Sequence, residues 1–420
     1  MVRNMNQSGL KTIMAILLFV LSAVLVSAQL YEWRGPGRSG IYNETGLLKN
    51  WPAGGPALIW EYANSGTGYS SATVTDDAVY VTGRKESDDV LTALTLDGKK
   101  KWEVVYGKAW TANHDGTRCT PTFYNGRIFL ISGSGDIVCV GTDGKIKWSK
   151  NHYSLYSSKP LMFGISESPL AFDNMVIASP GGKKASVVAF SMDDGKVLWE
   201  AEPVDAAPQY VNPLLIEYAG RKMIITVMET NILAINAKDG RIVWKLDYVA
   251  ANSGQPRSYK NHAITPVFRD GEIFIGNGYN FIALKLKLSP DGNSVTKVWE
   301  NTAFDPQLGG VVLLGDHLYG STHQAKPSDS WACVDWKTGK TLWTSKWYSK
   351  GSIISADGML YLYEEKSGHV ALVKPNPAKL EILSEFQVTK GDGPFWPHPA
   401  IKNGRLYIRH GEVLMVYKVK

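Results

Sequence analysis

Short runs of alternating hydrophobic and polar residues, separated by Gly and Asp, follow one another along most of the chain. "EIFIGNG" (272–278) and "RLYIRHG" (405–411) have the alternation expected of strands with one buried face. "RIFLISG" (127–133) and "DIVCVGT" (136–142) are rich in β-branched and aromatic residues and end at turn residues. This pattern predicts an all-β protein built from short antiparallel strands.

One turn sequence is repeated between these strands. It reads "DDGKVLWE" at 193–200 and returns as "LDGKKKWE" (96–103), "TDGKIKWS" (142–149), "KDGRIVWK" (238–245) and "KTGKTLWT" (337–344). The Asp-Gly or Thr-Gly pair suits a hairpin, because Gly tolerates the positive φ of the turn and Asp bonds to its own backbone. We expect the turn to join the third and fourth strands of a repeated unit.

The aromatic residues that follow the turn define the period of the repeat. Successive members lie 42 to 55 residues apart, from Trp60 to Trp102 at the shortest and Trp244 to Trp299 at the longest. The set is Trp60, Trp102, Trp148, Trp199, Trp244, Trp299, Trp343 and Phe386. A β-type repeat of this length predicts a propeller with one four-stranded antiparallel blade per repeat, and the set predicts eight blades.

The two ends of the chain predict how the ring closes. The residues after Phe386 supply only three strands, and one unassigned strand, "ALIWEYA" at 57–63, precedes the first blade. We expect residues 57–63 to pair with residues 412–420, because this pairing removes an exposed sheet edge. The eight-bladed propeller then spans residues 57–420, and residues 29–56 form an N-terminal extension across one face.

A small residue stands nine or ten positions before several of these Trp residues, for example Ala189 before Trp199. We expect it to make room for the indole of a neighbouring repeat. Cys139 and Cys333 hold this position, so they are predicted to be buried thiols. The role of Cys119 stays open, and three cysteines leave at least one thiol free.

Residues 1–28 have the features of a signal peptide. Arg3 and Lys11 precede the apolar run "IMAILLFVLSAVLV", and "VSA" at 26–28 offers small residues for cleavage. A retained membrane anchor is the alternative. Gln29 stands where a lipoprotein would carry its Cys, and no later segment is apolar enough to span a membrane. We therefore expect a periplasmic or secreted protein without a lipid anchor.

The net charge argues against one class of partner. The chain has a formal net charge of +6, to which the leader residues Arg3 and Lys11 contribute, and it has no basic tract. This charge is too small to indicate nucleic-acid binding. A hydrophobic content of 44% indicates a packed globular protein, and we expect a monomer.

The repeat resembles a known family. "CVDWKTGKTLW" at 333–343 is similar to the tryptophan-docking repeat of pyrroloquinoline quinone (PQQ) dehydrogenase-like propellers, with Cys in place of Ala. Four longer stretches resemble secreted bacterial PQQ-like repeat proteins: "EWRGPGRSGIYNETGLLKNWP", "TRCTPTFYNGRIFLISG", "ESPLAFDNMVIASPGG" and "WPHPAIKNGRLYIRHG". The resemblance implies the scaffold and does not specify a reaction.

The chemistry of the quinoprotein enzymes is not carried over with the repeat. Those enzymes usually hold a disulfide between adjacent cysteines beside the quinone, but here the cysteines are scattered and no Cys-x-x-Cys-His haem site is present. No segment aligns with their calcium ligands or catalytic Asp. The catalytic residues are unknown, no metal ligands are predicted, and no cofactor is firmly implied, although PQQ with calcium stays possible.

The predicted binding site is the funnel where the loops of the blades converge on the propeller axis. These loops carry Trp110, His114, Asp115, Arg118, Tyr156, Phe163, Glu167, Tyr210, Asn212, Asn261, His262, Asn277, His323, Glu364, Glu365, Lys366, Trp396, His398, Arg409 and His410. Aromatic, cationic and amide side chains together suit a planar anion or a sugar. As the lining we predict Arg118, Glu167, Asn212, His262, His398 and Arg409.

Three functions compete at this point. The favoured one is a non-catalytic periplasmic or secreted propeller that binds a small molecule, a saccharide or a protein at its funnel face. The second is a PQQ-dependent dehydrogenase acting on alcohols or sugars. The third follows from a resemblance to the propeller subunit of the outer-membrane β-barrel assembly machinery, although the missing lipid-attachment Cys argues against it.

Overall fold

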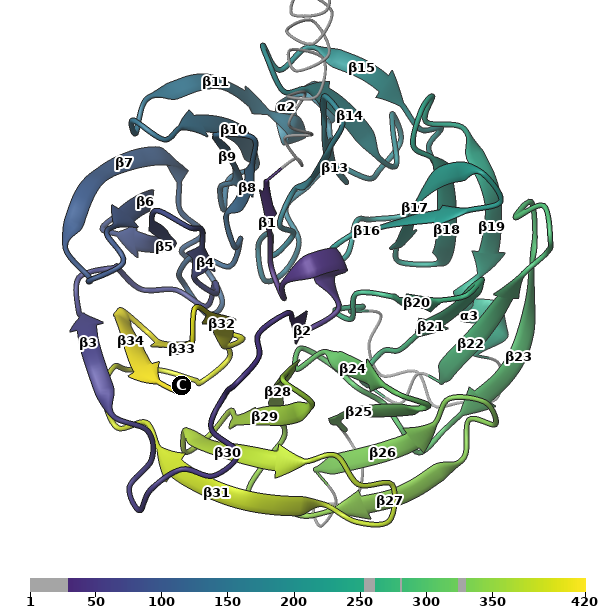
Figure 1. The fold of residues 1–420 in the computed structure, drawn as a ribbon. Helices are drawn as coiled ribbons and strands as arrows, with labels where there is room; N and C mark the ends of the chain where they lie inside the picture. The colour runs from purple at the N-terminus through teal and green to yellow at the C-terminus, as the bar shows by residue number, and fades with distance from the viewer. Residues whose placement is uncertain (1–28, 253–260, 280–281, 324–329) are drawn as a thin grey trace, which may run out of the picture.

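The computed structural model describes residues 29–252, 261–279, 282–323 and 330–420. In these residues the strands form eight antiparallel four-stranded blades arranged in a ring, with short N-terminal strands added to two of them (Figure 1). The predicted eight-bladed propeller is confirmed. The predicted signal peptide at 1–28 lies outside the described residues. No helix in the described part of the chain is long and apolar enough to cross a bilayer.

Each blade follows the chain order from its inner to its outer strand, except the last. Blades one to four consist of β4 (Thr73–Val74), β5 (Val79–Lys85), β6 (Asp88–Leu94) and β7 (Lys100–Lys108); β8 (Thr122–Tyr124), β9 (Arg127–Ile131), β10 (Asp136–Gly141) and β11 (Ile146–Asn151); β12 (Leu170–Phe172), β13 (Met175–Ala178), β14 (Val188–Ser191) and β15 (Val197–Glu200); and β16 (Leu214–Tyr218), β17 (Arg221–Val227), β18 (Asn231–Asn236) and β19 (Ile242–Asp247). The short helices α2 (His152–Tyr156) and α3 (Tyr248–Ala251) follow the outer strands of blades two and four.

Blades five to eight repeat the same plan. They consist of β20 (Val267–Arg269), β21 (Glu272–Ile275), β22 (Ala283–Leu288) and β23 (Val295–Asn301); β24 (Val311–Leu314), β25 (His317–Ser321), β26 (Trp331–Asp335) and β27 (Thr341–Ser345); β28 (Gly351–Ala356), β29 (Met359–Glu364), β30 (His369–Lys374) and β31 (Glu381–Gln387); and β32 (Ala400–Lys402), β33 (Arg405–His410) and β34 (Val413–Lys418) with β3 (Leu58–Tyr62). The core consists of the faces where neighbouring blades pack together.

The ring closes as the sequence predicts. β3 pairs antiparallel with β34, with Trp60 opposite Val416 and Tyr62 opposite Leu414. The N-terminal strand thus becomes the outer strand of blade eight, beside the C-terminal strand (Figure 1). This exchange leaves no blade with only three strands, so the last sheet has the same protected edges as the others.

The repeated turn and its Trp join a blade to the next at five of the junctions. Trp199 of blade three donates from Nε1 to the carbonyl of Ala237 in blade four at 3.2 Å, and its ring lies over Gly240 of the Asp-Gly turn. Trp60, Trp102, Trp148 and Trp299 make the same contact with Gly98, Gly144, Gly195 and Gly339. These glycines have positive φ, for example 76° at Gly240. A turn without a side chain is therefore what lets the indole approach the backbone.

The small residue before the Trp has a different neighbour from the expected one. Ala189 lies directly opposite Trp199 of its own blade in the pairing of β14 with β15. The indole of Trp199 points toward the neighbouring blade. What it meets there is the turn glycine, Gly240. Cys139 and Cys333 likewise face Trp148 and Trp343, and all three cysteines are buried free thiols.

The N-terminal segment crosses the centre of the ring. β1 (Leu30–Tyr31) pairs with the inner strand β8 of blade two, and β2 (Ile41–Tyr42) pairs in parallel with the inner strand β28 of blade seven. The 3-10 helix η1 (Pro36–Arg38) lies between them, near the axis (Figure 1). This path carries the residues of 32–38 to the middle of the propeller.

Buried charge fastens the segment there. Arg38 forms a buried ion pair with Glu32 at 2.8 Å and donates to the carbonyl of Pro169 at 2.8 Å. Arg34 donates to the carbonyls of Val311 at 2.6 Å and Ile353 at 3.1 Å. Because these carbonyls lie on or directly before the inner strands of blades three, six and seven, the segment is bonded to several blades at once.

Candidate functional site

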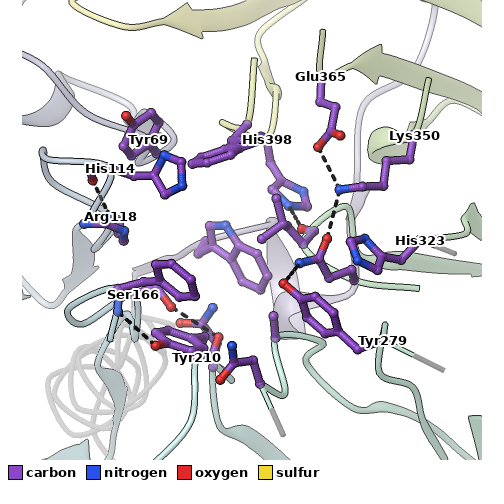
Figure 2. Close-up of a pocket in the computed structure, with 18 residues that line it drawn as sticks. Tyr69, His114, Arg118, Ser166, Tyr210, Tyr279, His323, Lys350, Glu365 and His398 are labelled. Carbon is purple, nitrogen blue, oxygen red and sulfur yellow. Dashed lines mark hydrogen bonds and ion pairs between the residues drawn. The ribbon is translucent and has the colours of Figure 1, made fainter. Parts of the chain in front are cut away.

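A cavity of about 390 Å³ lies where the loops before the inner strands meet the N-terminal segment. Its lining is drawn in Figure 2. The lining residues are Trp33, Tyr69, His114, Arg118, Phe163, Ser166, Tyr210, Asn212, Asn261, Ala263, Tyr279, Gln307, Leu308, His323, Lys350, Glu365, Trp396 and His398. This volume falls within the range of about 300 to 1,000 Å³ that is typical of small-molecule sites. All eight blades contribute, because each sends a loop toward the axis.

One side of the cavity is aromatic. The ring centroids of Tyr69 and Trp396 lie 5.0 Å apart, those of His114 and Trp396 lie 4.9 Å apart, and those of Phe163 and Tyr210 lie 5.9 Å apart. The tilted and edge-on geometries are those that aromatic pairs prefer. These loops come from blades one to four and blade eight, so the rings form one continuous wall.

The opposite side is polar and internally bonded. Lys350 Nζ lies 2.8 Å from a carboxylate oxygen of Glu365 and donates to the amide oxygen of Gln307 at 2.9 Å. The amide nitrogen of Gln307 donates to the hydroxyl of Tyr279 at 2.6 Å. Figure 2 shows this chain of contacts running along the right of the cavity. The lysine and the carboxylate are therefore already paired with each other.

His398 connects the cavity to the N-terminal segment. Its Nε2 lies 2.8 Å from the carbonyl of Leu308, and its Nδ1 lies 3.1 Å from a guanidinium nitrogen of Arg34. A carbonyl can only accept and a guanidinium can only donate, so Nε2 carries the hydrogen and Nδ1 accepts. Burial, together with the charge of Arg34, lowers the pKa of His398 to about 3. The imidazole is thus neutral, and both of its nitrogens are occupied.

Three of the six predicted site residues line this cavity: Arg118, Asn212 and His398. The guanidinium of Arg118 donates to the carbonyls of Gly116 at 2.9 Å and Asn113 at 3.0 Å, and also to that of His114. The amide oxygen of Asn212 accepts from the backbone of Ser168 at 2.5 Å. Arg118 is thus held by its own loop, and Asn212 is held by the loop that precedes the neighbouring blade three.

The other three predicted residues, Glu167, His262 and Arg409, are buried and do not belong to the lining. Glu167 accepts from the backbone and hydroxyl of Ser179. His262 accepts at its backbone carbonyl from Tyr210 at 2.9 Å. Arg409 donates to the carbonyls of Gly411 and Gly66, each at 2.9 Å. Each therefore connects loops within or between blades instead of facing the cavity.

Several lining residues are absent from the sequence-based set of funnel residues. They are Trp33, Tyr69, Ser166, Ala263, Tyr279, Gln307, Leu308 and Lys350. Tyr69 and Lys350 stand just before the inner strands of blades one and seven, so the repeat register alone could have found them. Trp33 could not be found in this way, because its place depends on the path of the N-terminal segment.

The buried carboxyl of Glu167 leads to a prediction on pH. Burial raises its pKa from 4.5 to about 8, so the folded protein keeps a proton that the unfolded chain has lost. Stability from this group is complete below pH 4.5 and is lost as the pH rises to 8, by up to about 1.4 kcal/mol per pH unit. Urea melts from pH 5 to 9 should therefore show the stability of Glu167→Gln rising relative to wild type up to pH 8.

The comparison with Glu167→Gln cancels the opposing histidines. Burial lowers the pKa of His152, His323 and His398, so these groups make wild type more stable as the pH rises toward 6.5. These histidines are present in both wild type and Glu167→Gln, so their contributions cancel in the difference in stability between the two proteins. Parallel stability profiles for the two proteins would show that the Glu167 carboxyl does not titrate differently on folding.

The described residues contain no group of three or more His, Cys, Asp or Glu side chains that could hold a metal ion. Cys119, whose role the sequence left open, accepts from the backbone of Ile131 at 3.2 Å. Burial raises the pKa of its thiol to about 12. It is a protonated core residue.

Comparison with known proteins places the chain in a family. The model of the family described as outer membrane protein assembly factor BamB matches residues 107–345, which is more than half of the 420 residues. The chain belongs to the BamB family. The resemblance to PQQ-like repeat propellers is thereby confirmed, since this family shares the repeat.

One curated relative of this BamB-family chain is the outer membrane protein assembly factor BamB of Shewanella oneidensis, which is 22% identical over 217 residues. The match covers 49% of this chain, and the chain spans about half the length of that relative.

Solved structures share the fold. BamB from Moraxella catarrhalis has a TM-score of 0.61 at 13% identity and covers 86% of this chain and 99% of its own. A europium-containing methanol dehydrogenase has a TM-score of 0.53 at 11% identity, covering 89% of this chain and 88% of its own. Sqt1 of Saccharomyces cerevisiae has a TM-score of 0.57 at 9% identity, and the match covers 87% of this chain and 99% of Sqt1. At such identities the likeness concerns the fold alone.

Proposed function

We propose that this protein is a non-catalytic binding scaffold of the cell envelope that takes part in the assembly of outer-membrane proteins. The observation that carries the proposal is the cavity chemistry, read together with the family. Glu365, the one carboxylate of the lining, is paired with Lys350, and both ring nitrogens of His398 are bonded, to Arg34 and to Leu308. A general base must be able to reach a substrate proton. A site whose one carboxylate is neutralised by a lysine, and whose His398 imidazole is bonded at both nitrogens, suits recognition better than proton transfer.

The residues present do not fit a quinone cofactor with its cation. Quinone-dependent oxidation needs a cation at the quinone carbonyls and a base within about 3 Å of the substrate proton. Among the lining residues, Glu365 is the one carboxylate, and Lys350 already neutralises it. The propeller fold is therefore compatible with a PQQ-dependent dehydrogenase, but the lining lacks ligands for the cation.

The proposed location rests on the leader. Residues 1–28 are proposed to be a signal peptide that is removed, residues 29–56 an N-terminal extension, and residues 57–420 the propeller proper. Export would place the mature chain where outer-membrane proteins pass. With Gln29 after the cleavage position, the mature protein would be free in the periplasm or secreted.

The function is tested in the source bacterium by deleting the gene and measuring the amount of outer-membrane proteins. We expect the amount to fall, and to be restored by the full chain but not by a version that begins at residue 29. Unchanged outer-membrane proteins in the deletion strain would contradict the assembly role. Rescue by the version without residues 1–28 would contradict export by this leader.

A second measurement tests the absence of catalysis. The purified mature protein is titrated with PQQ and calcium, and its melting temperature and dye reduction with alcohols and sugars are followed. We expect no turnover and no stabilisation, since a tightly bound ligand would raise the melting temperature. Stabilisation with turnover would establish the dehydrogenase instead.

A further inference from the structure

Two chemically different walls face each other across the cavity. Figure 2 shows Tyr69, His114 and Tyr210 on one side, and Tyr279, His323, Lys350 and Glu365 on the other. The first wall offers ring faces and edges, whereas the second offers hydrogen-bonding groups in a row. A sugar ring has the matching pair of surfaces, with C–H groups on its faces and hydroxyls around its edge.

Two buried polar atoms of the lining have no hydrogen-bond partner among the described residues. They are the amide nitrogen of Asn261 and Nδ1 of His323. Buried polar atoms normally find a partner, because leaving one unpaired costs the desolvation of that group. An occupant that carries several hydroxyls can bond to both, whereas a purely apolar occupant would leave them unpaired.

The charge of the lining is positive. It contains two cations, Arg118 and Lys350, and one carboxylate, Glu365. Lys350 and Glu365 neutralise each other in their 2.8 Å ion pair. Arg118 donates to backbone carbonyls and lies 5.5 Å from the centre of the Tyr69 ring, beside the aromatic wall. In a partly enclosed site, this remaining charge favours an anionic ligand.

We propose that this cavity binds an acidic saccharide, a pyranose that carries a carboxylate. The sugar ring packs on the aromatic wall at Trp396 and Tyr69, and its carboxylate lies at Arg118. Its hydroxyls bond across the cavity to Asn261 and to the Lys350–Glu365 pair. The inference rests on the proposed function in one respect, namely that the cavity binds its ligand without transforming it.

Isothermal titration calorimetry on residues 29–420 tests the proposal with three probes. Galacturonate has the ring and the acid, galactose has the same ring without the acid, and citrate has acids without the ring. We expect galacturonate to bind at least tenfold more tightly than galactose, and citrate to show no binding. If citrate binds as tightly as galacturonate, the proposal that the ligand is a saccharide is overturned. If galacturonate does not bind, the proposal that the cavity is a binding site for acidic saccharides is overturned.

Variants separate the two walls. Arg118→Gln should bring the affinity for galacturonate down to that for galactose, because it removes the cation and keeps a polar side chain. Trp396→Ala should weaken both sugars at least tenfold. Arg241→Gln changes an exposed arginine of a blade turn and should leave binding unchanged, which controls for overall charge. Binding unaffected by Trp396→Ala would overturn the proposal even where Arg118→Gln fails to fold.

The two proposals fail in different experiments. If no saccharide binds, the assembly role still stands on the deletion strain. If galacturonate binds and is oxidised in the presence of PQQ and calcium, the binding site stands and the non-catalytic function falls.

Discussion

Deleting residues 29–63 from the mature chain is expected to abolish cooperative folding. The deletion removes β3, so blade eight is left with three strands and β34 becomes an exposed edge. It also removes Trp60, whose ring covers Gly98 of blade one and whose Nε1 donates to the carbonyl of Leu96 at 3.0 Å. Blades one and eight then keep only the packing of their remaining strands, and the free edge of β34 favours aggregation. Circular dichroism during heating checks the result.

The matched control is the shorter deletion of residues 29–56, which keeps β3. This variant loses the Glu32–Arg38 ion pair and the hydrogen bonds of Arg34, but its ring still closes. It should melt cooperatively at a lower temperature than the mature chain. A soluble, cooperatively melting protein after deletion of residues 29–63 would show that ring closure by β3 is dispensable.

The fold could be predicted from the sequence because one local device is repeated. The turn and the following Trp recur every 42 to 55 residues, and at five junctions the Trp ring packs on the turn glycine of the next blade. Even the degenerate member fits this plan. Phe386 packs on Gly55, the glycine before β3, so the turn of blade eight is supplied by the N-terminal segment.

The site was predicted only in part because its residues do not share a local signal. Arg118, Asn212 and His398 stand in loops that reach the cavity, whereas Glu167 stands in a comparable loop and Arg409 near the end of β33, and both are buried. Their difference is which way each side chain turns, and this depends on partners distant in sequence, such as Gly66 for Arg409. A polar residue near the axis can face a ligand or hold two loops together, and the repeat pattern does not distinguish these roles.

Packing between blades should depend most strongly on the turn glycines and their Trp residues. Trp199→Ala is expected to lower the free energy of unfolding by about 3 to 5 kcal/mol, the usual cost of truncating a buried large aromatic. Trp199 is 9% exposed and loses both its contact with Gly240 and its hydrogen bond to Ala237. Urea denaturation of the mature protein and the variant measures the difference.

Gly240→Ala tests the same contact from the other blade. A Cβ there would lie 2.5 Å from the ring of Trp199, closer than packed atoms allow, so the indole must move. Part of the cost arises from φ, which is 76° at Gly240, but Gly220 has a φ of 73° and open space around its Cβ position. Gly220→Ala therefore carries the backbone strain alone, about 1 to 2 kcal/mol. Gly240→Ala should cost a further 1 to 3 kcal/mol, roughly the penalty for overpacking a core. If the two variants lose equal free energy of unfolding, the indole of Trp199 does not require a turn without a side chain. The repeated glycine would then serve only the positive φ of the hairpin.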